Sequence, residues 1–426
     1  MTITIFLGSL LGAMALGIPI AFALILCGIA LMLHMDMFDA QIVAQTLING
    51  ADSFPLMAVP FFLLAGELMN AGGLSRRIVD VAVSLVGHVK GGLGFVAILA
   101  GCVLAALSGS AVADAAALSA LLVPMMVRVG HDKARSAGLV AAAGCIGPVI
   151  PPSIGFIIFG VAGGLSITKL FLAGIVPGIL MGAGLAVAWW LVVRKDDVAT
   201  APRHTARQRV QALAQGFWAL LLPVVIIAGL KFGVFTPTEA AVVAVVYSLF
   251  VAVVVYRELR LADLYGIFVA SAKTSAVVML LIAAAMVSAW MITAADLPGM
   301  IVELLEPWMD NKTLLLLVIM ALVVLVGTAM DMTPTILILT PVLLPVVKAA
   351  GIDPIYFGVL FIMNCAIGLI TPPVGTVLNV VAGVSKLSMG EVVKGVWPFL
   401  LAELAVLFLL VLFPALVTVP AQWFAR

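Results

Sequence analysis

The sequence predicts an all-α integral membrane protein whose two halves repeat each other in inverted orientation. Three observations lead to this fold class: the composition, the length of the apolar runs, and a self-similarity at one fixed spacing. Of the 426 residues, 65% are hydrophobic and only 10% are charged, and the mean hydropathy is +1.31. Such values lie far outside the range of soluble domains. The lipid bilayer is therefore the expected environment of the chain.

The composition also narrows the classes of function. The formal net charge of +1 gives no indication of a nucleic-acid partner. The cysteines occur singly in apolar runs, without the spacing of a disulfide or a transition-metal site. They are Cys27, Cys102, Cys145 and Cys365. The first apolar stretch, residues 4–33, is longer than the core of a signal peptide and lacks a basic leader, so it predicts a permanent span.

A shift of 221 positions superimposes the two halves without a gap. Under this shift Pro124 falls on Pro345, and Pro151 falls on Pro372. The other matched pairs are Gly130 and Gly351, Asp132 and Asp353, Gly147 and Gly368, Pro152 and Pro373, Gly174 and Gly395, and Pro177 and Pro398. Irregular backbone survives in a bilayer only where it is buried in protein or lines a watery cavity. Matched Gly and Pro interruptions are therefore typical of the central site of a transporter.

Long apolar runs predict the membrane spans. The spans are residues 4–33, 55–72, 134–165, 170–193, 212–232, 237–256, 270–294, 355–385 and 390–418. Two of them, 134–165 and 355–385, contain the matched Pro-Pro pairs. Proline lacks the N–H that a helix interior needs, so these two spans are predicted to be broken helices.

Two further regions, residues 92–128 and 313–348, each hold a pair of apolar segments of about 15 residues around a small polar tip. At 1.5 Å per residue, such a segment reaches only part of the way across a hydrocarbon core of about 30 Å. Each region is therefore predicted to be a re-entrant helical hairpin. Two ordinary short spans in each region are the alternative.

The distribution of Lys and Arg predicts the orientation. Basic residues gather at 76–77, 128–135, 194–209 and 257–260, whereas 34–39 and 303–310 contain no Lys or Arg. Placing the basic clusters in the cytoplasm leaves the N-terminus inside and the C-terminus outside. The connectors matched by the shift then lie on opposite sides, which favours an inverted repeat. The predicted organisation is a first repeat (1–194), a cytoplasmic loop and linking helix (195–221), and a second repeat (222–426).

Each half offers a hairpin tip followed by a broken helix. Helix ends at a break aim N–H groups or carbonyls inward, and oxygen-bearing side chains beside them suit a hard cation such as Na⁺. Asp114 and Asp331 are the only acidic residues of the tips, and an intramembrane carboxylate indicates a functional site. Helix capping by these two residues, and close helix packing by Ser, Thr and Gly, are the alternatives. Glu67 is predicted either to carry protons or to reach the membrane interface.

Six motifs spread along the whole chain are specific to one family. They are residues 55–73 (PLMAVPFFLLAGELMNAGG), 87–94 (GHVKGGLG), 108–118 (SGSAVADAAAL), 151–153 (PPS), 234–241 (VFTPTEAA) and 331–345 (DMTPTILILTPVLLP). In these motifs the chain resembles the large permease subunit of TRAP transporters, the DctM family. The resemblance implies a sodium-driven importer of organic acids in the bacterial inner membrane. It also implies two partners, a small DctQ-type membrane subunit and a soluble DctP-type periplasmic binding protein.

Members of this family are similar to elevator-type transporters, in which hairpins and broken helices slide as one domain against a scaffold. Carried over by motif, the resemblance implies substrate contacts from Ser110, Asp114 and Ser153. The expected Na⁺ ligands lie around the tips and breaks: Ser108, Gly109, Gly147, Pro151, Gly327, Thr328, Asp331, Thr333, Asn364, Gly368 and Thr371. Pro152, Pro334 and Pro372 complete the two half-sites. No cofactor and no transition metal is expected.

Other classes of function remain to be weighed. A stand-alone sodium/dicarboxylate symporter would share the architecture but need no partners, and an anion channel would lack stoichiometric coupling. The sequence contains no catalytic dyad and no phosphate-binding G-x-x-x-x-G-K-[ST] run, which disfavours an enzyme or an ATP-driven pump. C4-dicarboxylates, sialic acids, keto acids and sugar acids stay open as substrates. Because neither tip nor break contains Lys or Arg, bound Na⁺ and inward-facing helix N-termini are expected to compensate the charge of an organic anion.

Overall fold

The computed structural model describes residues 2–196, 198, 200, 203–309 and 311–425. Across these residues the only regular structure is helical, which confirms the all-α prediction. Eight of the described helices are long and apolar enough to cross a membrane. Residues 197, 199 and 201–202 of the predicted basic loop lie outside the described residues, as do Asp310 and the two terminal residues.

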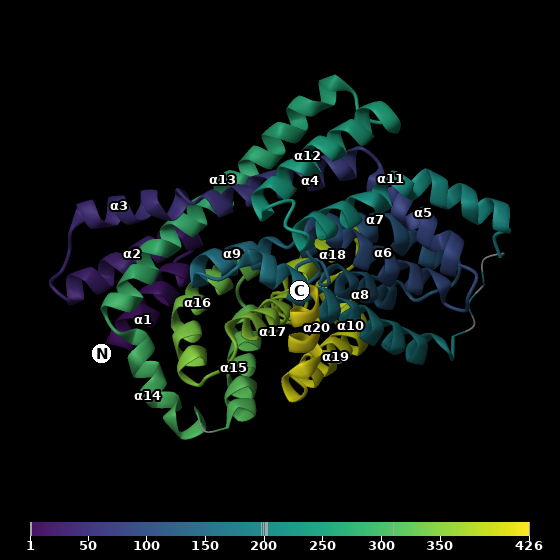
Figure 1. Cartoon of the computed structure of the whole chain (residues 1–426). Helices are drawn as coiled ribbons and strands as arrows, with labels where there is room; N and C mark the ends of the chain where they lie inside the picture. The colour runs from purple at the N-terminus through teal and green to yellow at the C-terminus, as the bar shows by residue number, and fades with distance from the viewer. Residues whose placement is uncertain (1, 197, 199, 201–202, 310, 426) are drawn as a thin grey trace.

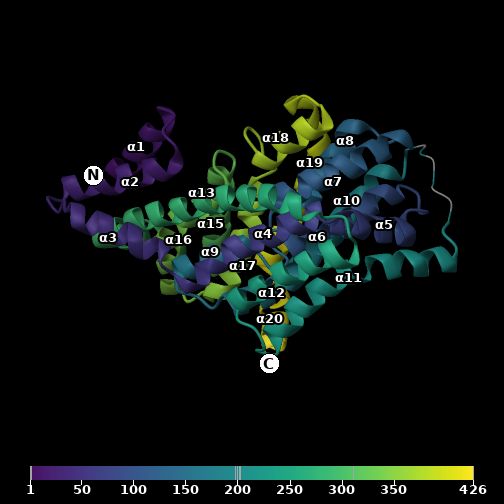
Figure 2. The same ribbon diagram turned by 90° about the horizontal axis from the view of Figure 1, so that it is seen from above.

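An outer set of helices flanks an inner set. In the first half the outer set is α1 (Thr2–Ala15), α2 (Ile20–His34), α3 (Ala40–Ala51), the 3₁₀ turn η1 (Phe54–Met57), α4 (Ala58–Ala71) and α5 (Leu74–Val86). In the second half it is α11 (Ala206–Lys231), α12 (Pro237–Phe250), the π-helical η2 (Val251–Val255), α13 (Leu261–Ala294) and α14 (Leu297–Met309). Helices α1–α3 lie at one end of the molecule and α5 lies at the other (Figures 1 and 2).

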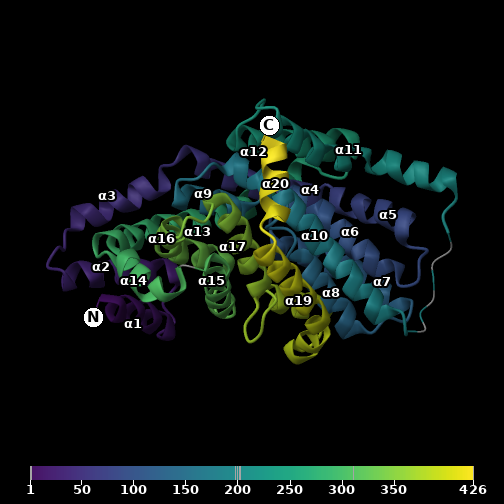
Figure 3. The same cartoon turned by 60° about the horizontal axis from the view of Figure 1, so that its bottom comes forward.

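The inner set consists of two runs of five helices in the same order. The first run is α6 (Gly92–Ser108), α7 (Ala111–Arg128), α8 (Lys133–Gly144), α9 (Ile154–Gly163) and α10 (Ile167–Val193). The second is α15 (Lys312–Gly327), α16 (Met332–Ala349), α17 (Pro354–Gly368), α18 (Thr376–Ser385) and α19 (Met389–Leu412). Each helix of the second run begins within one residue of the position that the shift of 221 predicts. The C-terminal α20 (Ala415–Ala425) packs on α10 (Figure 3).

Local chemistry explains the tight connection and the breaks. Between α6 and α7, Gly109 adopts a φ of +60°, a left-handed conformation that suits glycine. Ser110 then caps α7, because its Oγ accepts a hydrogen bond from Ala113 N. The predicted spans 134–165 and 355–385 are each interrupted, since α8 and α17 end before the Pro-Pro pairs and α9 and α18 begin after them. The broken helices are therefore present in both halves.

One predicted single span is wrong, and another ends earlier than predicted. Residues 4–33 form two helices, because Gly17 turns the chain with a φ of +79° and Pro19 lacks a donor for the helix ladder. Helix α1 then packs against α2. The predicted span 390–418 is present as α19, which ends at Leu412, before Pro414, and the separate helix α20 follows. Because α1 packs against α2, residues 4–33 no longer count as one crossing of the membrane. The side of the membrane on which the N-terminus lies therefore stays a prediction.

Helices α3, α5 and α14 were not predicted, because none of them is a long apolar run. On α5, Arg76 and Asp80 are exposed whereas Ile78 and Val79 are buried. This helical alternation of polar and apolar faces is the signal that could have revealed the helix.

The inner set encloses most of the large buried side chains. Phe159 and Phe361 are fully buried, and their ring centroids lie 5.5 Å apart across the α9–α17 contact. Helices α8 and α19 approach so closely at Gly138 and Gly395 that a Cβ on either glycine would collide with the backbone of the other helix. Small residues allow such approach between membrane helices, whose association draws little on the hydrophobic effect. The two runs of five helices are thus packed into one body.

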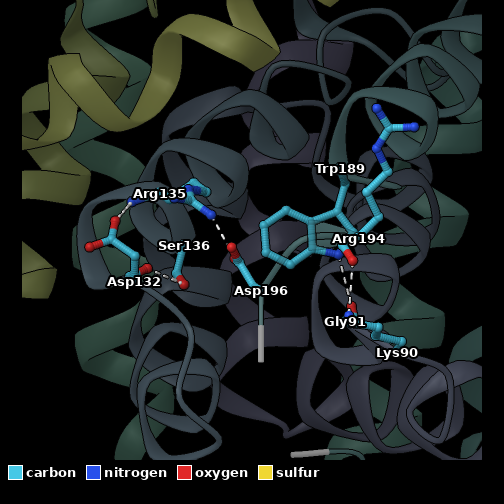
Figure 4. A network of polar contacts seen from close by, with 8 residues as sticks. All are labelled: Lys90, Gly91, Asp132, Arg135, Ser136, Trp189, Arg194 and Asp196. Carbon is cyan, nitrogen blue, oxygen red and sulfur yellow. Dashed lines mark hydrogen bonds and ion pairs between the residues drawn. The ribbon is translucent and has the colours of Figure 1, made fainter. Parts of the chain in front are cut away.

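A polar network joins the end of α10 to α6 and α8 (Figure 4). Arg135 forms an ion pair of 2.6 Å with Asp196, and Trp189 Nε1 donates a hydrogen bond of 2.8 Å to Gly91 O. The His131 ring packs on Trp189 with a centroid distance of 5.2 Å. Burial lowers the pKa of this imidazole, although Asp196 raises it, so the ring packs as a neutral group at pH 7. The network secures the connection that leads out of the first inner run.

The crossing of α8 and α19 generates a first prediction. We expect Gly138→Ala to lower the stability by about 1–3 kcal/mol, because the added methyl forces the two helices apart. Gly390→Ala is the matched control, since a Cβ there meets nothing within 4 Å. Thermal unfolding of the purified protein in detergent measures both. Equal melting temperatures for the two variants would contradict the close approach.

Candidate functional site

A cavity of about 430 Å³ lies where the two hairpin tips meet α4 and α13. The first tip contributes residues 108–113, and the second contributes 331–333. Gly66 and Glu67 of α4 and Thr274 of α13 face them across the cavity. Four segments that are far apart in the sequence therefore share one space between the inner and outer sets.

The polar groups of this cavity are hydroxyls, one amide and two carboxylates. They belong to Glu67, Asn70, Ser108, Ser110, Thr274, Asp331 and Thr333. No Lys, Arg or His appears among the described residues that line the cavity. An organic anion would find hydrogen-bond partners here but no basic side chain. Compensation of its charge must come from a bound cation or from helix N-termini.

Asp331 opens into the cavity from the start of α16. It is exposed, and its Oδ1 accepts a hydrogen bond of 3.2 Å from Thr376 Oγ1. Within the described residues its carboxylate makes no capping bond to α16. Thr376 begins α18, so this contact ties the second tip to the far side of the second break. The side chain of Asp331 therefore does not cap α16, and its role as a cation ligand stays a prediction.

Asp114 lies behind the first tip instead of in the cavity wall. It is 3% exposed, and its Oδ1 accepts a hydrogen bond of 2.6 Å from Ser108 Oγ. Its Oδ2 has no hydrogen-bond partner in the part of the chain that the structure describes. This oxygen faces the first break, 2.9 Å from the point where a Cβ on Gly147 would lie. Asp114 therefore joins the tip to the break, and its contact with substrate stays a prediction.

Ser153 is fully buried in the first break. Its Oγ donates a hydrogen bond to Pro148 O and accepts one of 3.2 Å from Phe156 N, so it caps α9. Gly109 lies directly against the backbone of Pro152 and Ser153. The first tip and the first break are thus in backbone contact. Ser153 provides part of the contacting backbone and caps the helix that follows.

The second half closes in a related way. A Cβ on Gly327 would lie 3.1 Å from Gly368 Cα, so these two glycines are in backbone contact. Asn364 is fully buried, and its Nδ2 donates a hydrogen bond of 2.7 Å to Met320 O. The hydroxyl of Thr371 donates to a backbone carbonyl of its own segment.

The structure divides the predicted site residues into two groups. Those that line the common cavity are Ser108, Gly109, Ser110, Asp331 and Thr333. Those that lie at or beside a tip or a break, outside the cavity lining, are Asp114, Gly147, Pro151, Ser153, Gly327, Thr328, Asn364, Gly368 and Thr371.

Sequence reasoning missed the contribution of the outer helices. Asn70 and Thr274 line the cavity although neither belongs to a tip or a break. A signal was present, because Asn70 follows Glu67 by three residues and side chains at that spacing share one helix face.

The outer helices meet the two hairpins at different heights. On α4, a Cβ on Gly66 would lie 3.7 Å from Ser108 Cβ, close to the first tip. Helix α13 instead packs along α16, beside a cleft of about 340 Å³ that Trp290 and Leu344 help to line. The repeat-related cleft on α7, of about 490 Å³, is lined by Val123 among others and by no described residue of α4. The hairpin of the first half therefore packs against α4 at a different position along its length than the hairpin of the second half packs against α13.

Comparison with known proteins matches one family along nearly the whole chain. The family described as "Tripartite ATP-independent periplasmic transporter, DctM component" matches residues 7–416. The chain is 57% identical over 423 residues to the 2,3-diketo-L-gulonate TRAP transporter large permease protein YiaN of Escherichia coli K12, across 99% of this chain and 100% of that protein. It is 39% identical to the sialic acid TRAP transporter large permease protein SiaM of Vibrio cholerae, across 95% of each.

Two further similarities concern a longer relative and the fold. The isethionate TRAP transporter permease protein DctMQ of Oleidesulfovibrio alaskensis is 39% identical, across 95% of this chain and 64% of that protein. Among solved structures, the YdaH transporter of Alcanivorax borkumensis shares the fold with a TM-score of 0.65 at 18% identity. The match covers 88% of this chain and 89% of that one.

The bond between Ser108 and Asp114 generates a second prediction. We expect Ser108→Ala to lower the stability by about 1–3 kcal/mol, because it leaves the buried carboxylate without a donor. Ser119→Ala is the matched control on the same hairpin, since the buried Ser119 hydroxyl has no partner among the described residues. Thermal unfolding of both variants in detergent is the measurement. A control variant that loses as much stability as Ser108→Ala would contradict the assignment.

Proposed function

Because the chain belongs to the DctM family of TRAP transporter large permease subunits, we propose that it imports an organic acid by coupling the movement of the acid to Na⁺. The observation that carries this proposal is the single cavity shared by both hairpin tips and two outer helices. Hydroxyl, amide and carboxylate oxygens converge there from elements of both repeats. Such convergence at interrupted helices is the arrangement that secondary transporters use for substrate and coupling ion.

The proposal includes the setting and partners of the subunit. It works in a bacterial inner membrane, with the basic connectors on the cytoplasmic side and the C-terminus in the periplasm. A small DctQ-type membrane subunit and a DctP-type periplasmic binding protein complete the transporter. In support, the relative named DctMQ is longer than this chain, which covers 64% of it.

Sodium binds before the substrate in this proposal. Asp331 and the hydroxyls of Ser110 and Thr333 offer oxygen ligands at the cavity wall. In the first half, the unpartnered Oδ2 of Asp114 faces the break at Gly147, an orphaned buried oxygen that fits a cation. Bound cations would neutralise these carboxylates and supply the positive charge that the lining side chains lack. Affinity for the organic acid should therefore vanish in potassium medium.

The substrate that we propose is a hydroxylated keto or sugar acid. The relative at 57% identity is named for 2,3-diketo-L-gulonate. The hydroxyl and amide groups of the cavity, such as Asn70, Ser110 and Thr274, suit a ligand with many hydroxyl groups. C4-dicarboxylates and sialic acids are the competing classes in an uptake assay.

We further propose that transport follows an elevator mechanism, in which the inner set slides against the outer set. The difference in register between the two halves supports it. After the slide, in the second state of the transporter, α4 would line the cleft on α7. Helix α13 lines the repeat-related cleft on α16 in the same way in the state described here. Asn70 now shares the cavity with Ala116, and Val123 lies two turns farther along the same face of α7. Seven residues at 1.5 Å each correspond to a slide of about 10 Å.

A third prediction tests the coupling. In proteoliposomes that contain the chain and its small subunit, we expect Asp331→Asn to reduce Na⁺-driven uptake of 2,3-diketo-L-gulonate at least about tenfold, a loss of about 1.4 kcal/mol or more. Asp353→Asn is the matched control, because Asp353 caps α17 outside the cavity and asparagine caps equally well. Equal uptake by both variants would contradict the role of Asp331.

The same assay distinguishes the tripartite transporter from a stand-alone symporter. Uptake that requires both Na⁺ and the binding protein supports the proposal. Uptake that is driven by Na⁺ without the binding protein would instead identify an autonomous symporter.

A fourth prediction tests the slide. We expect the pair Asn70→Cys with Ala116→Cys to cross-link in the state described here, and the pair Asn70→Cys with Val123→Cys to cross-link in the other state. Each cross-link should abolish uptake, because it holds the inner set in one register. Variants with a single added cysteine are the controls, because they report any cross-link to a native cysteine; Cys27, Cys145 and Cys365 are buried and Cys102 is half-buried. Failure of the Val123 pair to cross-link in actively transporting protein would contradict the slide.

A further inference from the structure

We propose that Glu67 makes the cavity discriminate against organic acids with two carboxylates and in favour of those with one. This inference rests on the proposed function, because it concerns what the cavity between the tips admits. It names the charge of the substrate and the residue that selects it.

Glu67 occupies the face of α4 that looks across the cavity at both tips. The side chain is exposed, and it makes no ion pair and no hydrogen bond within the described residues. Neither Arg76 nor Arg77, the basic residues nearest in sequence, forms an ion pair with Glu67 in the part of the chain that the structure describes. Arg77 is held by Glu258 in an ion pair of 2.6 Å, and its guanidinium lies 3.7 Å from the centroid of the Tyr256 ring. The carboxylate of Glu67 therefore adds an uncompensated negative charge to the cavity.

The other cavity carboxylate differs from Glu67 in its setting. Asp331 belongs to a tip and accepts a hydrogen bond from Thr376, close to the helix end where a coupling cation would bind. A bound cation at that tip offsets the charge of Asp331. Glu67 belongs to the outer set instead, so its charge remains when the tip is loaded. A second carboxylate on the substrate meets this charge without a basic residue among the described lining to offset it.

Charge repulsion sets the size of the effect. Two unit charges repel with an energy that falls with distance and with the effective dielectric constant, and partial exposure of the cavity weakens it. We expect an acid with one carboxylate to bind about tenfold more tightly than an acid with two, a difference of about 1.4 kcal/mol. A hydroxyl at the same position of the substrate can instead donate a hydrogen bond to Glu67, which adds to the preference.

The test uses two ligands that differ by one carboxylate. D-Gluconate and D-glucarate share a six-carbon polyhydroxylated chain, and only glucarate carries a carboxylate at both ends. Their binding to the complex of the full chain with its small subunit is measured by calorimetry in saturating Na⁺. The wild type should prefer gluconate, and Glu67→Gln should reduce the gluconate-to-glucarate affinity ratio about tenfold, mainly through tighter binding of glucarate.

Two further variants separate a local charge effect from other causes. Glu67→Asp keeps the charge and should keep most of the preference. Glu303→Gln removes an exposed carboxylate from α14, which does not line the cavity, and should leave the ratio unchanged. An unchanged ratio in Glu67→Gln, or an equal change in Glu303→Gln, would overturn the inference. Wild-type protein that binds neither acid in a Na⁺-dependent way would instead contradict the proposed function, and the inference would fall with it.

Discussion

Backbone groups that a helix break frees inside a membrane protein must find partners within the protein or in a water-filled cavity. In this chain each hairpin tip packs its backbone against the backbone of a helix break. Gly109 lies against Ser153, which caps α9, and Gly327 lies against Gly368. Because these contacts run from backbone to backbone, even a methyl group at the glycines would separate them. The position of both tips, and with it the cavity, depends on this mutual closure.

The two repeats carry their acidic residues at different positions of the contact between tip and break. The shift of 221 sets Asp331 opposite Ser110 and sets Thr335 opposite Asp114. The first half therefore keeps its carboxylate behind the tip, bonded to Ser108, whereas the second half turns its carboxylate into the cavity. The backbone arrangement is duplicated but the charges are not. Two half-sites built from matched helices can thus differ in what they bind.

The cavity belongs to neither set of helices alone. The tips bring hydroxyls and Asp331 from the inner set, while α4 and α13 bring Glu67, Asn70 and Thr274 from the outer set. A movement of one set against the other would take the cavity apart without unfolding either set, because each set has its own packed contacts. In the proposed mechanism, binding and movement would therefore be linked through this shared wall.

The sequence by itself determined the helical class, the duplication, and the places where helices break, because proline without an N–H and glycine at positive φ act locally. Only the tertiary structure decided which acid faces the cavity. Asp114 and Glu67 are both single carboxylates in apolar helices, yet packing buries Asp114 against Ser108 and leaves Glu67 exposed to the cavity. The rotation of a helix and the identity of its neighbour settle that outcome, and both depend on contacts between residues that are distant in the chain.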